Sequence, residues 1–377
     1  MRFGKLTKAA CSVTLSMAFL CGMTGPVHVS AAKVQSNYYY YNLLNAKQRA
    51  FWDKLEKKCA AISKSKKDLT GNELTFTGSA VNSLPGYGKG KNRQTGSMFV
   101  YELFIDSNPQ YFFLKRSEKR SSYTVKFEIE PAYLKGGIRQ KAASAIKKTA
   151  DAWVKEASKK SSERDKVKYL YDKLIAKASY KADSPDSQNI ASVFLNGPTV
   201  CNGYALSMNY LLNEAGIPAI TVHSYNHSWN KVRIGYNWYT LDPTWDDMGG
   251  SDHKWFLVSD AKAKKNDKDS FHVLNSYLEK LVPKAKYDKL KNASSKVAKP
   301  TVKIAAYKSD KVTLKIESAT DGAVYYCTKN GKTPDISSVK AFKSTGSYTV
   351  ALKDLRKVKV IAVKDGMKDS DAAAYGE

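Results

Sequence analysis

Apolar residues recur at helical spacing over four stretches of the chain, and this periodicity predicts amphipathic helices. The stretches span residues 45–62, 140–158, 162–178 and 201–215. The segment Ser161-Ser162-Glu163-Arg164-Asp165 offers an N-cap for the third of them. We expect the second and third helices to pack against a sheet formed later in the chain.

Short runs that alternate apolar and polar residues indicate strands, and they fall into three groups. The groups cover residues 74–78, 111–114 and 123–129, then 219–222, 229–234 and 238–242, then 301–305, 312–316, 323–327 and 358–363. The last group, with Gly and Asp turns between its runs, predicts an immunoglobulin-like β-sandwich. The fold class expected for the whole chain is α+β.

Length and composition divide the chain into an N-terminal leader and three regions. We expect an α/β lead-in at 33–131, a central domain at 132–290 and the sandwich at 299–377. A run of four tyrosines, residues 38–41, opens the lead-in. Such a run favours packing onto the domain over a stacking surface for sugar or peptide.

A cysteine stands at the predicted start of the helix at 201–215. Cys201 is followed by apolar residues at helical spacing, and Gly216 and Pro218 end the pattern. At a helix N-terminus, free backbone N–H groups and the positive end of the macrodipole favour a thiolate over a thiol. Cys201 is therefore a candidate nucleophile.

The strands at 229–234 and 238–242 predict a hairpin. If its turn is Gly235-Tyr236, Trp229 faces Asp242, and His227 is the diagonal neighbour of Asp242 on the same face. An imidazole held by a carboxylate on one nitrogen presents the other to a thiolate, as in cysteine acyl-transfer enzymes. A shift of the register by one residue would remove this arrangement.

Each of the three residues also has a structural interpretation. Free cysteines are often buried, His227 could be an ordinary surface histidine, and Asp242 before Pro243 could form a turn. A second histidine, His223, competes for the role of base. The three residues taken together favour the catalytic interpretation.

Ordered motifs around these residues resemble the core of bacterial secreted transglutaminase-like proteins. The motifs are residues 200–205, 211–219, 227–232, 238–239 and 242–246, and the resemblance covers about 180–260. It implies a papain-like fold in which the Cys, His and Asp of the family correspond to Cys201, His227 and Asp242. Ser228 stands where the family usually has Ala, and a hydroxyl is small enough to be tolerated there. The Trp-Asn signature follows His227, so the resemblance favours His227 over His223 as the base.

A second resemblance lies in the C-terminal region. Residues 322–334 and 360–366 resemble the C-terminal module of chitobiase-type and other secreted glycan-acting enzymes, with Cys327 in place of a usual Thr. Such modules act as spacers or as binders. We expect a spacer.

The resemblance and the local chemistry together predict a thioester formed on Cys201, with transfer to an amine as the first expectation. Hydrolysis by a cysteine peptidase or amidase, and a non-catalytic cell-surface binding or scaffold protein, stay as alternatives. Gln188 is a candidate second oxyanion donor beside the Cys201 backbone N–H. Trp229 and Trp245 are candidate substrate residues that could shield the thioester, although strand tryptophans more often pack.

Residues 1–31 read as a signal peptide. Arg2, Lys5 and Lys8 precede a short apolar run, and small residues lead to a predicted cleavage near Ala31. We therefore expect a secreted, extracellular or wall-associated protein without stable membrane insertion after cleavage. Three cysteines then remain, and their wide spacing suggests no disulfide framework, although a Cys59–Cys327 bridge is arithmetically possible.

The chain carries 62 Lys and Arg against 35 Asp and Glu, a formal charge of +27. Because the lysines are scattered and no nucleic-acid signature is present, we expect no nucleic-acid partner. Protein or peptide substrates are the expected partners, with anionic cell-wall polymers as a further hypothesis. No spacing typical of a metal or cofactor site is found, so we expect neither.

Overall fold

The computed structural model describes residues 37–78, 81, 83–87, 94–250, 252–267, 269–291 and 295–377. The described residues form one compact unit. The predicted signal peptide lies outside the described residues. Among those residues, no helix is both long enough and apolar enough to cross a membrane.

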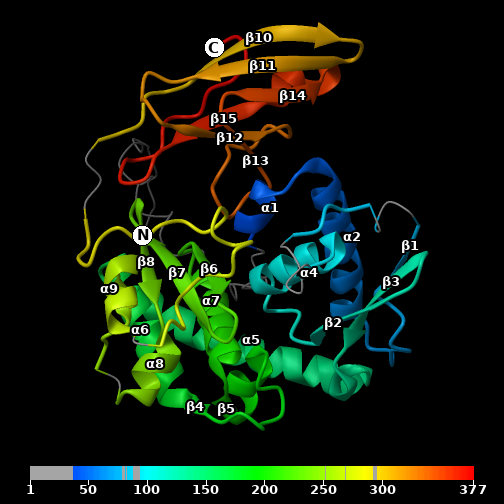
Figure 1. Ribbon diagram of the computed structural model, residues 1–377, viewed down its shortest axis with the longest axis vertical. Helices are drawn as coiled ribbons and strands as arrows, with labels where there is room; N and C mark the ends of the chain where they lie inside the picture. Colours follow the sequence, from blue (N-terminus) through cyan, green and yellow to red (C-terminus); the bar gives the residue numbers. More distant parts are fainter. Residues whose placement is uncertain are drawn as a thin grey trace, which may run out of the picture. The chain divides into compact units, whose positions relative to one another are not determined.

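The N-terminal region combines helices with a small antiparallel sheet (Figure 1). Its helices are α1 (Tyr39–Leu43), α2 (Ala46–Lys64) and α4 (Gly96–Ser107), and its sheet has the order β1 (Thr75–Thr77), β3 (Thr124–Ile129), β2 (Leu114–Arg120). Asn45 and Gln48 form a capping box at the start of α2. The helix predicted at 45–62 and the strands predicted at 74–78 and 123–129 are confirmed.

Two features of this region differ from the sequence prediction. The strand predicted at 111–114 is wrong, because this segment is a turn and β2 begins only at Leu114. Helix α4 was not predicted, since it is buried on nearly all sides and shows no amphipathic stripe. The tyrosine run is confirmed as packing, because Tyr39, Tyr40 and Tyr41 are all buried.

The central region sets long helices against a four-stranded antiparallel sheet. Its main elements are α5 (Gly136–Ser158), α6 (Glu163–Lys177), α7 (Cys201–Glu214), β6 (Ala219–His223), β7 (Ser228–Ile234), β8 (Asn237–Leu241) and β9 (Phe256–Val258), with the sheet order β6-β7-β8-β9. Figure 1 shows α7 lying along β6 and β7, which it contacts. Ser162, within the segment predicted to cap this helix, caps α6 by accepting from the backbone N–H of Asp165 at 3.1 Å. This mixed α/β arrangement fits a papain-like core.

Shorter elements complete the central region. They are η2 (Pro131–Tyr133), β4 (Ser179–Tyr180), η3 (Ser192–Asn196), β5 (Pro198–Thr199), α8 (Pro243–Met248) and α9 (Asp260–Asn266), and β4 and β5 form a parallel pair. The pair leads directly into α7. It therefore fixes the position at which the helix begins.

The hairpin of β7 and β8 has the predicted turn. Ile234 pairs with Asn237, so Gly235 and Tyr236 are the two turn residues. Gly235 has φ +58°, a left-handed conformation that a two-residue hairpin turn requires and glycine readily adopts. The pairing of Asn230 with Leu241 continues this register towards Trp229 and Asp242.

The C-terminal region contains two three-stranded antiparallel sheets. The first sheet has the order β10 (Thr301–Lys308), β11 (Lys311–Glu317), β14 (Ser347–Ala351). The second has the order β13 (Phe342–Ser344), β12 (Val324–Thr328), β15 (Lys359–Val363). The short helix η4 (Leu352–Lys357) lies between β14 and β15 in the sequence. Leu314 of one sheet and Cys327 and Val360 of the other belong to one buried cluster. The predicted β-sandwich is present, and its immunoglobulin-like topology stays a prediction.

Candidate functional site

Cys201 is the first residue of α7 and is partly exposed. The preceding residue, Val200, is extended with φ −119° and ψ 179°, so the chain enters the helix abruptly. Gly203 allows the preceding strand to approach, because a Cβ at this position would lie 1.9 Å from Thr199 Oγ1. The sequence around Cys201 therefore fixes the sulfur at an accessible helix N-terminus.

His227 lies between Cys201 and Asp242. Its Nε2 is 2.6 Å from Asp242 Oδ2, and the Cys201 side chain is within hydrogen-bonding reach of the ring. Because Nε2 is engaged by the carboxylate, Nδ1 is the nitrogen available to the thiol. The structure thus brings all three candidate catalytic residues together.

Burial and charge act in opposition on this pair. Burial disfavours the protonated form of His227, but the Asp242 carboxylate and then Cys201 outweigh it and raise the pKa of His227 to about 10. Burial would raise the pKa of Asp242, yet His227 and His272 hold it well below its usual range. A protonated imidazole held by an ionised carboxylate is the state that this arrangement favours.

Asp242 has a second contact through its other oxygen. Oδ1 accepts from the backbone N–H groups of Thr244 at 3.0 Å and Trp245 at 3.2 Å, which caps α8. Pro243 stands at the first helical position, where its missing N–H costs nothing. Asp242 therefore orients His227 and starts a helix at once.

His272 was not predicted from the sequence. Its Nε2 is 2.8 Å from Asp242 Oδ2, its Nδ1 is 3.2 Å from Asp267 Oδ2, and its ring stacks on Trp255 at 4.3 Å. It lies in an irregular segment with no periodic pattern, so no signal in the sequence pointed to it. Asp242 Oδ2 is thus shared by two histidines.

His227, Asp242 and His272 are also the residues whose chemistry suits a metal ion. Among the residues that the structure describes, they form the one such group, with ligand atoms within 4.8 Å of one another. Both Nε2 atoms are already at hydrogen-bonding distance from Asp242 Oδ2. An ion would have to replace these two hydrogen bonds.

A cleft of about 350 Å³ opens beside Cys201 and His227. Its lining is polar and comprises Gln94, Glu102, Arg116, Gln188, Cys201, Asn202, His223, Ser224, Tyr225, Asn226, His227, Ser228, Asn275 and Tyr277. A carbonyl-containing substrate of peptide size could reach the thiol there. The remaining candidate residues can be located relative to this cleft.

His223 lies on the cleft wall, but both of its ring nitrogens are engaged. Nδ1 is 2.7 Å from Ser228 Oγ, and Nε2 is 2.9 Å from both carboxylate oxygens of Asp106. Asp106 is buried and also binds Arg116. Ser228, the departure from the family pattern, therefore has a partner in His223.

Gln188, Trp229 and Trp245 occupy different places. Gln188 lines the cleft with Cys201, and the main-chain carbonyl of Gln188 accepts a hydrogen bond from Asn202 Nδ2 at 2.8 Å. Trp229 and Trp245 contact the His227 ring, both with centroids at 5.9 Å, and are not among the residues that line the cleft. The tryptophans pack around the base, outside the substrate space.

The cysteines of the described region are all free. Cys59 and Cys327 are buried in separate parts of the chain, one in α2 and one in the sandwich core. Burial raises the pKa of the Cys327 thiol to about 12 and that of Cys59 further still. The arithmetically possible Cys59–Cys327 bridge is absent.

Comparison with known proteins places this site in a family context. A model of the Transglutaminase-like superfamily matches residues 151–243, which include Cys201, His227 and Asp242. No curated protein matches the chain.

Solved structures with similarity to the chain include three proteins. The first is a TGase, 21% identical over 34% of this chain and 43% of that chain, with a TM-score of 0.25. The second is a candidate cysteine protease from Cytophaga hutchinsonii, 24% identical over 26% of this chain and 37% of that chain, with a TM-score of 0.23. The third is a candidate protease from Parabacteroides distasonis, 11% identical over 52% of this chain and 41% of that chain, with a TM-score of 0.20. The chain spans less than half the length of each. The similarity to the Transglutaminase-like superfamily therefore concerns residues 151–243, at the centre of the chain.

Proposed function

We propose that this protein is a secreted transglutaminase-like enzyme that transfers acyl groups from protein or peptide amides through a thioester. The observation that carries the proposal is the continuous contact from the Cys201 thiol through His227 to Asp242. A thiol, a base and an orienting carboxylate in this order are what covalent acyl transfer requires. Cys201, His227 and Asp242 are the proposed catalytic residues.

The proposed reaction begins with the Cys201 sulfur, as thiolate, attacking the amide carbonyl carbon to give a tetrahedral intermediate. The oxyanion accepts from the Cys201 backbone N–H at the start of α7, and Gln188 is the proposed second donor because it lines the same cleft. His227 gives its proton to the departing nitrogen, and the C–N bond breaks. The product is a thioester plus ammonia from a glutamine amide, or an amine from a peptide bond.

The acceptor then determines the reaction class. A lysine amine, deprotonated by His227, attacks the thioester, releases Cys201 and forms an isopeptide bond. Water acting in the same way gives a carboxylic acid, which is peptidase or amidase chemistry. Hydrolysis is the second candidate, and one observation favours it. Trp229 and Trp245 contact the His227 ring but do not line the cleft, so they do not shield a thioester in the cleft from water.

One experiment separates these outcomes. The protein is incubated with a glutamine-containing peptide and a tagged primary amine, and the peptide is analysed by mass spectrometry. Attachment of the tag supports transfer, conversion of glutamine to glutamate without the tag supports amidase activity, and shortened peptide supports peptidase activity. The Cys201→Ala variant is the control, and products that persist in it would contradict the proposed nucleophile.

A non-catalytic binding or scaffold role is distinguished by thiol reactivity. If Cys201 is a catalytic thiol, an alkylating probe near neutral pH labels it faster than Cys59 and Cys327, which are buried. Equal, slow labelling of all three cysteines would favour the scaffold. Peptide mapping of the labelled protein identifies the modified residue.

Export and contact with anionic cell-wall polymers remain part of the proposal, supported by the leader-like residues 1–31 and the formal charge of +27. Intact-mass measurement of the extracellular protein tests export, because cleavage near Ala31 removes Met1. Release of the protein from intact cells by raised salt tests electrostatic retention, since salt screens surface charges. A protein that salt does not release is not held by such polymers.

A further inference from the structure

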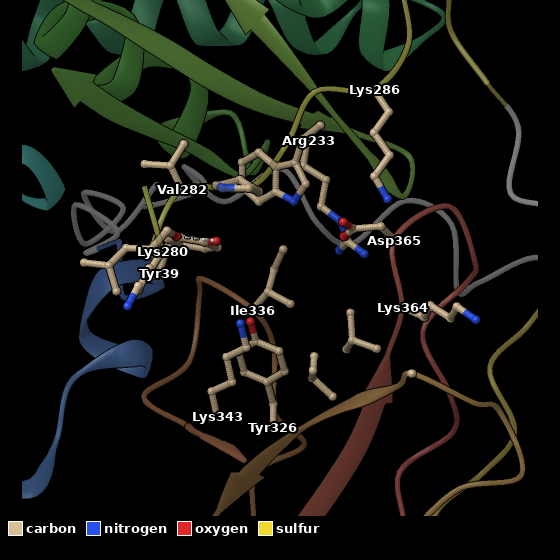
Figure 2. Close-up of a pocket in the computed structure, with 16 residues that line it drawn as sticks. Tyr39, Arg233, Lys280, Val282, Lys286, Tyr326, Ile336, Lys343, Lys364 and Asp365 are labelled. Atoms are coloured by element: carbon tan, nitrogen blue, oxygen red, sulfur yellow. Dashed lines mark hydrogen bonds between the residues drawn. The ribbon is translucent and has the colours of Figure 1, made fainter. Parts of the chain in front are cut away.

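A second cavity lies between the central region and the β-sandwich (Figure 2). Its volume is about 350 Å³, within the range of about 300–1,000 Å³ typical of small-molecule sites. It shares no lining residue with the cleft at Cys201. The cavity is therefore separate from the proposed catalytic site.

The two sides of the cavity come from distant parts of the sequence. Tyr39 comes from α1 of the N-terminal region, Arg233 and Trp238 come from β7 and β8, and Lys286 comes from the segment after α9. The sandwich contributes Tyr326 and Lys343. Tyr39 and Trp238 contact each other edge to face, with ring centroids at 5.3 Å. Aromatic and aliphatic groups thus provide walls for the body of a ligand.

The charge of the lining is strongly one-sided. It holds five cationic side chains, Arg233, Lys280, Lys286, Lys343 and Lys364, against the single carboxylate of Asp365. Arg233 is paired with Asp369 at 2.9 Å, and Figure 2 shows Lys364 pointing away from the cavity. The lysines at 280, 286 and 343 form no salt bridge within the described part of the chain.

Lys343 is a half-buried cation of the cavity wall. It is the cross-strand partner of Tyr326, and Figure 2 shows both side chains rising from the sandwich into the cavity. Burial lowers the pKa of Lys343, and the charge of Asp365 opposes that change only in part. A half-buried ammonium without a direct partner is costly, and an anion in the cavity would offset this cost.

Lys286 reaches the same space from the other side. Figure 2 shows its ammonium and the Arg233 guanidinium directed towards the region beside Asp365. Positive groups therefore approach the cavity from both the central region and the sandwich. Cations on both walls of one cavity favour an anionic ligand.

We propose that this cavity binds a compact anionic sugar, a sugar acid or a sugar phosphate, with its charged oxygens at Lys343 and Lys286 and its body against Tyr39 and Trp238. A carboxylate and a phosphate both offer negatively charged oxygens to the lysines. Binding measurements distinguish a sugar acid from a sugar phosphate.

Isothermal titration calorimetry on the full chain tests the site with glucuronate, glucose 6-phosphate, inorganic phosphate and neutral glucose. We expect one or both anionic sugars to bind at least tenfold more tightly than glucose and inorganic phosphate. The tighter of glucuronate and glucose 6-phosphate identifies the anionic group. Absence of binding by both anionic sugars at millimolar concentration would overturn the proposal, as would inorganic phosphate binding as tightly as the sugars.

Matched lysine variants assign the binding to this cavity. Lys343→Met and Lys286→Met each remove one cation from the lining, and each is expected to weaken binding at least tenfold. Lys286 is exposed, so its variant remains informative if Lys343→Met fails to fold. Lys303→Met removes an exposed lysine of β10 outside the cavity, and an equal loss of affinity in this control would show non-specific attraction to the basic surface and refute the site.

Discussion

Asp242 uses its two carboxylate oxygens for two different tasks. Oδ2 faces His227 and His272, whereas Oδ1 caps α8. The sequence left two interpretations of this residue open. The proposed catalytic role belongs to Oδ2, and the turn-forming role belongs to Oδ1. Substitutions can separate them.

Asp242→Asn and Asp242→Ala test this division. Both remove the charge that orients His227, so both are expected to lower kcat on the order of 10²–10⁴-fold. Asn keeps an oxygen for the cap and Ala does not, so Ala should cost about 1 kcal/mol more in free energy of unfolding. Steady-state kinetics and urea denaturation measure the two effects, and equal stability of the two variants would show that the cap is unimportant.

The raised pKa of His227 makes both activity and stability depend on pH. The folded pKa is about 10 and the ordinary value 6.5, so protonation stabilises the fold fully below about pH 6.5, and this contribution is lost as pH rises through 10. The proton available to the leaving group is lost over the same alkaline range. We expect the alkaline limb of the kcat/KM profile near pH 10 and its displacement towards neutral pH in Asp242→Asn.

That pH profile is measured with wild type and Asp242→Asn side by side. Chemical denaturation at pH 6, 8 and 10 gives the matching stability curve. A wild-type alkaline limb near pH 6.5, unchanged in the variant, would contradict a carboxylate-stabilised imidazolium.

His272 is expected to position Asp242 without touching the substrate. His272→Phe removes the donor to Oδ2, so kcat should fall on the order of tenfold with KM unchanged. His272→Gln retains an N–H donor and should recover part of that loss. Kinetics of both variants test this, and equal activity of Phe and Gln at equal stability would argue for packing alone.

At the scale of elements, the sequence predicted what local chemistry determines. The Gly235-Tyr236 turn and the helix start at Cys201 follow from turn residues and spacing, and both lie where predicted. Helix α4 and His272 depend on long-range burial and on an irregular segment, which leave no periodic signal. The three proposed catalytic residues could therefore be located from the sequence, but the second histidine on Asp242 could not.

The start of α7 is held by close approach at Gly203. Gly203→Ala would place a Cβ 1.9 Å from Thr199 Oγ1, so we expect a loss of about 1–3 kcal/mol in stability and a larger fall in activity as Cys201 shifts. Gly137→Ala in α5 is the matched control, because nothing lies within 4 Å of its Cβ. The control should gain roughly 0.5–1 kcal/mol. Thermal unfolding and labelling of Cys201 measure these outcomes, and a fully active Gly203→Ala would contradict the constraint.

At the scale of the whole chain, the N-terminal residues connect the central region to the sandwich. Asn37 donates to the carbonyl of Ala219 at 2.5 Å, and Tyr40 donates to that of Thr221 at 2.8 Å. Asn42, which is fully buried, binds the segment before β13. The sandwich is attached to the rest of the fold through these contacts and through Arg233–Asp369.

Asn42→Ala tests this attachment. The Asn42 amide donates to Val339 O at 3.0 Å and accepts from Ala341 N at 2.7 Å, and its loss leaves these buried groups without their partner. We expect a loss of about 1–3 kcal/mol in unfolding free energy and faster proteolysis near residues 335–341. Exposed Asn330→Ala serves as the control, and equal effects of the two variants would show that Asn42 does not hold the sandwich.

The contacts of α1 with the sandwich determine when the N-terminal region can finish folding during synthesis of the chain. Asn42 leaves the ribosome early, but its partners Ile336, Val339 and Ala341 follow 294, 297 and 299 residues later. At about 5–20 residues per second, the delay is roughly 15–60 s. During that interval α1 has no native docking site on the sandwich, so the N-terminal region completes its folding only when almost the entire polypeptide has been made.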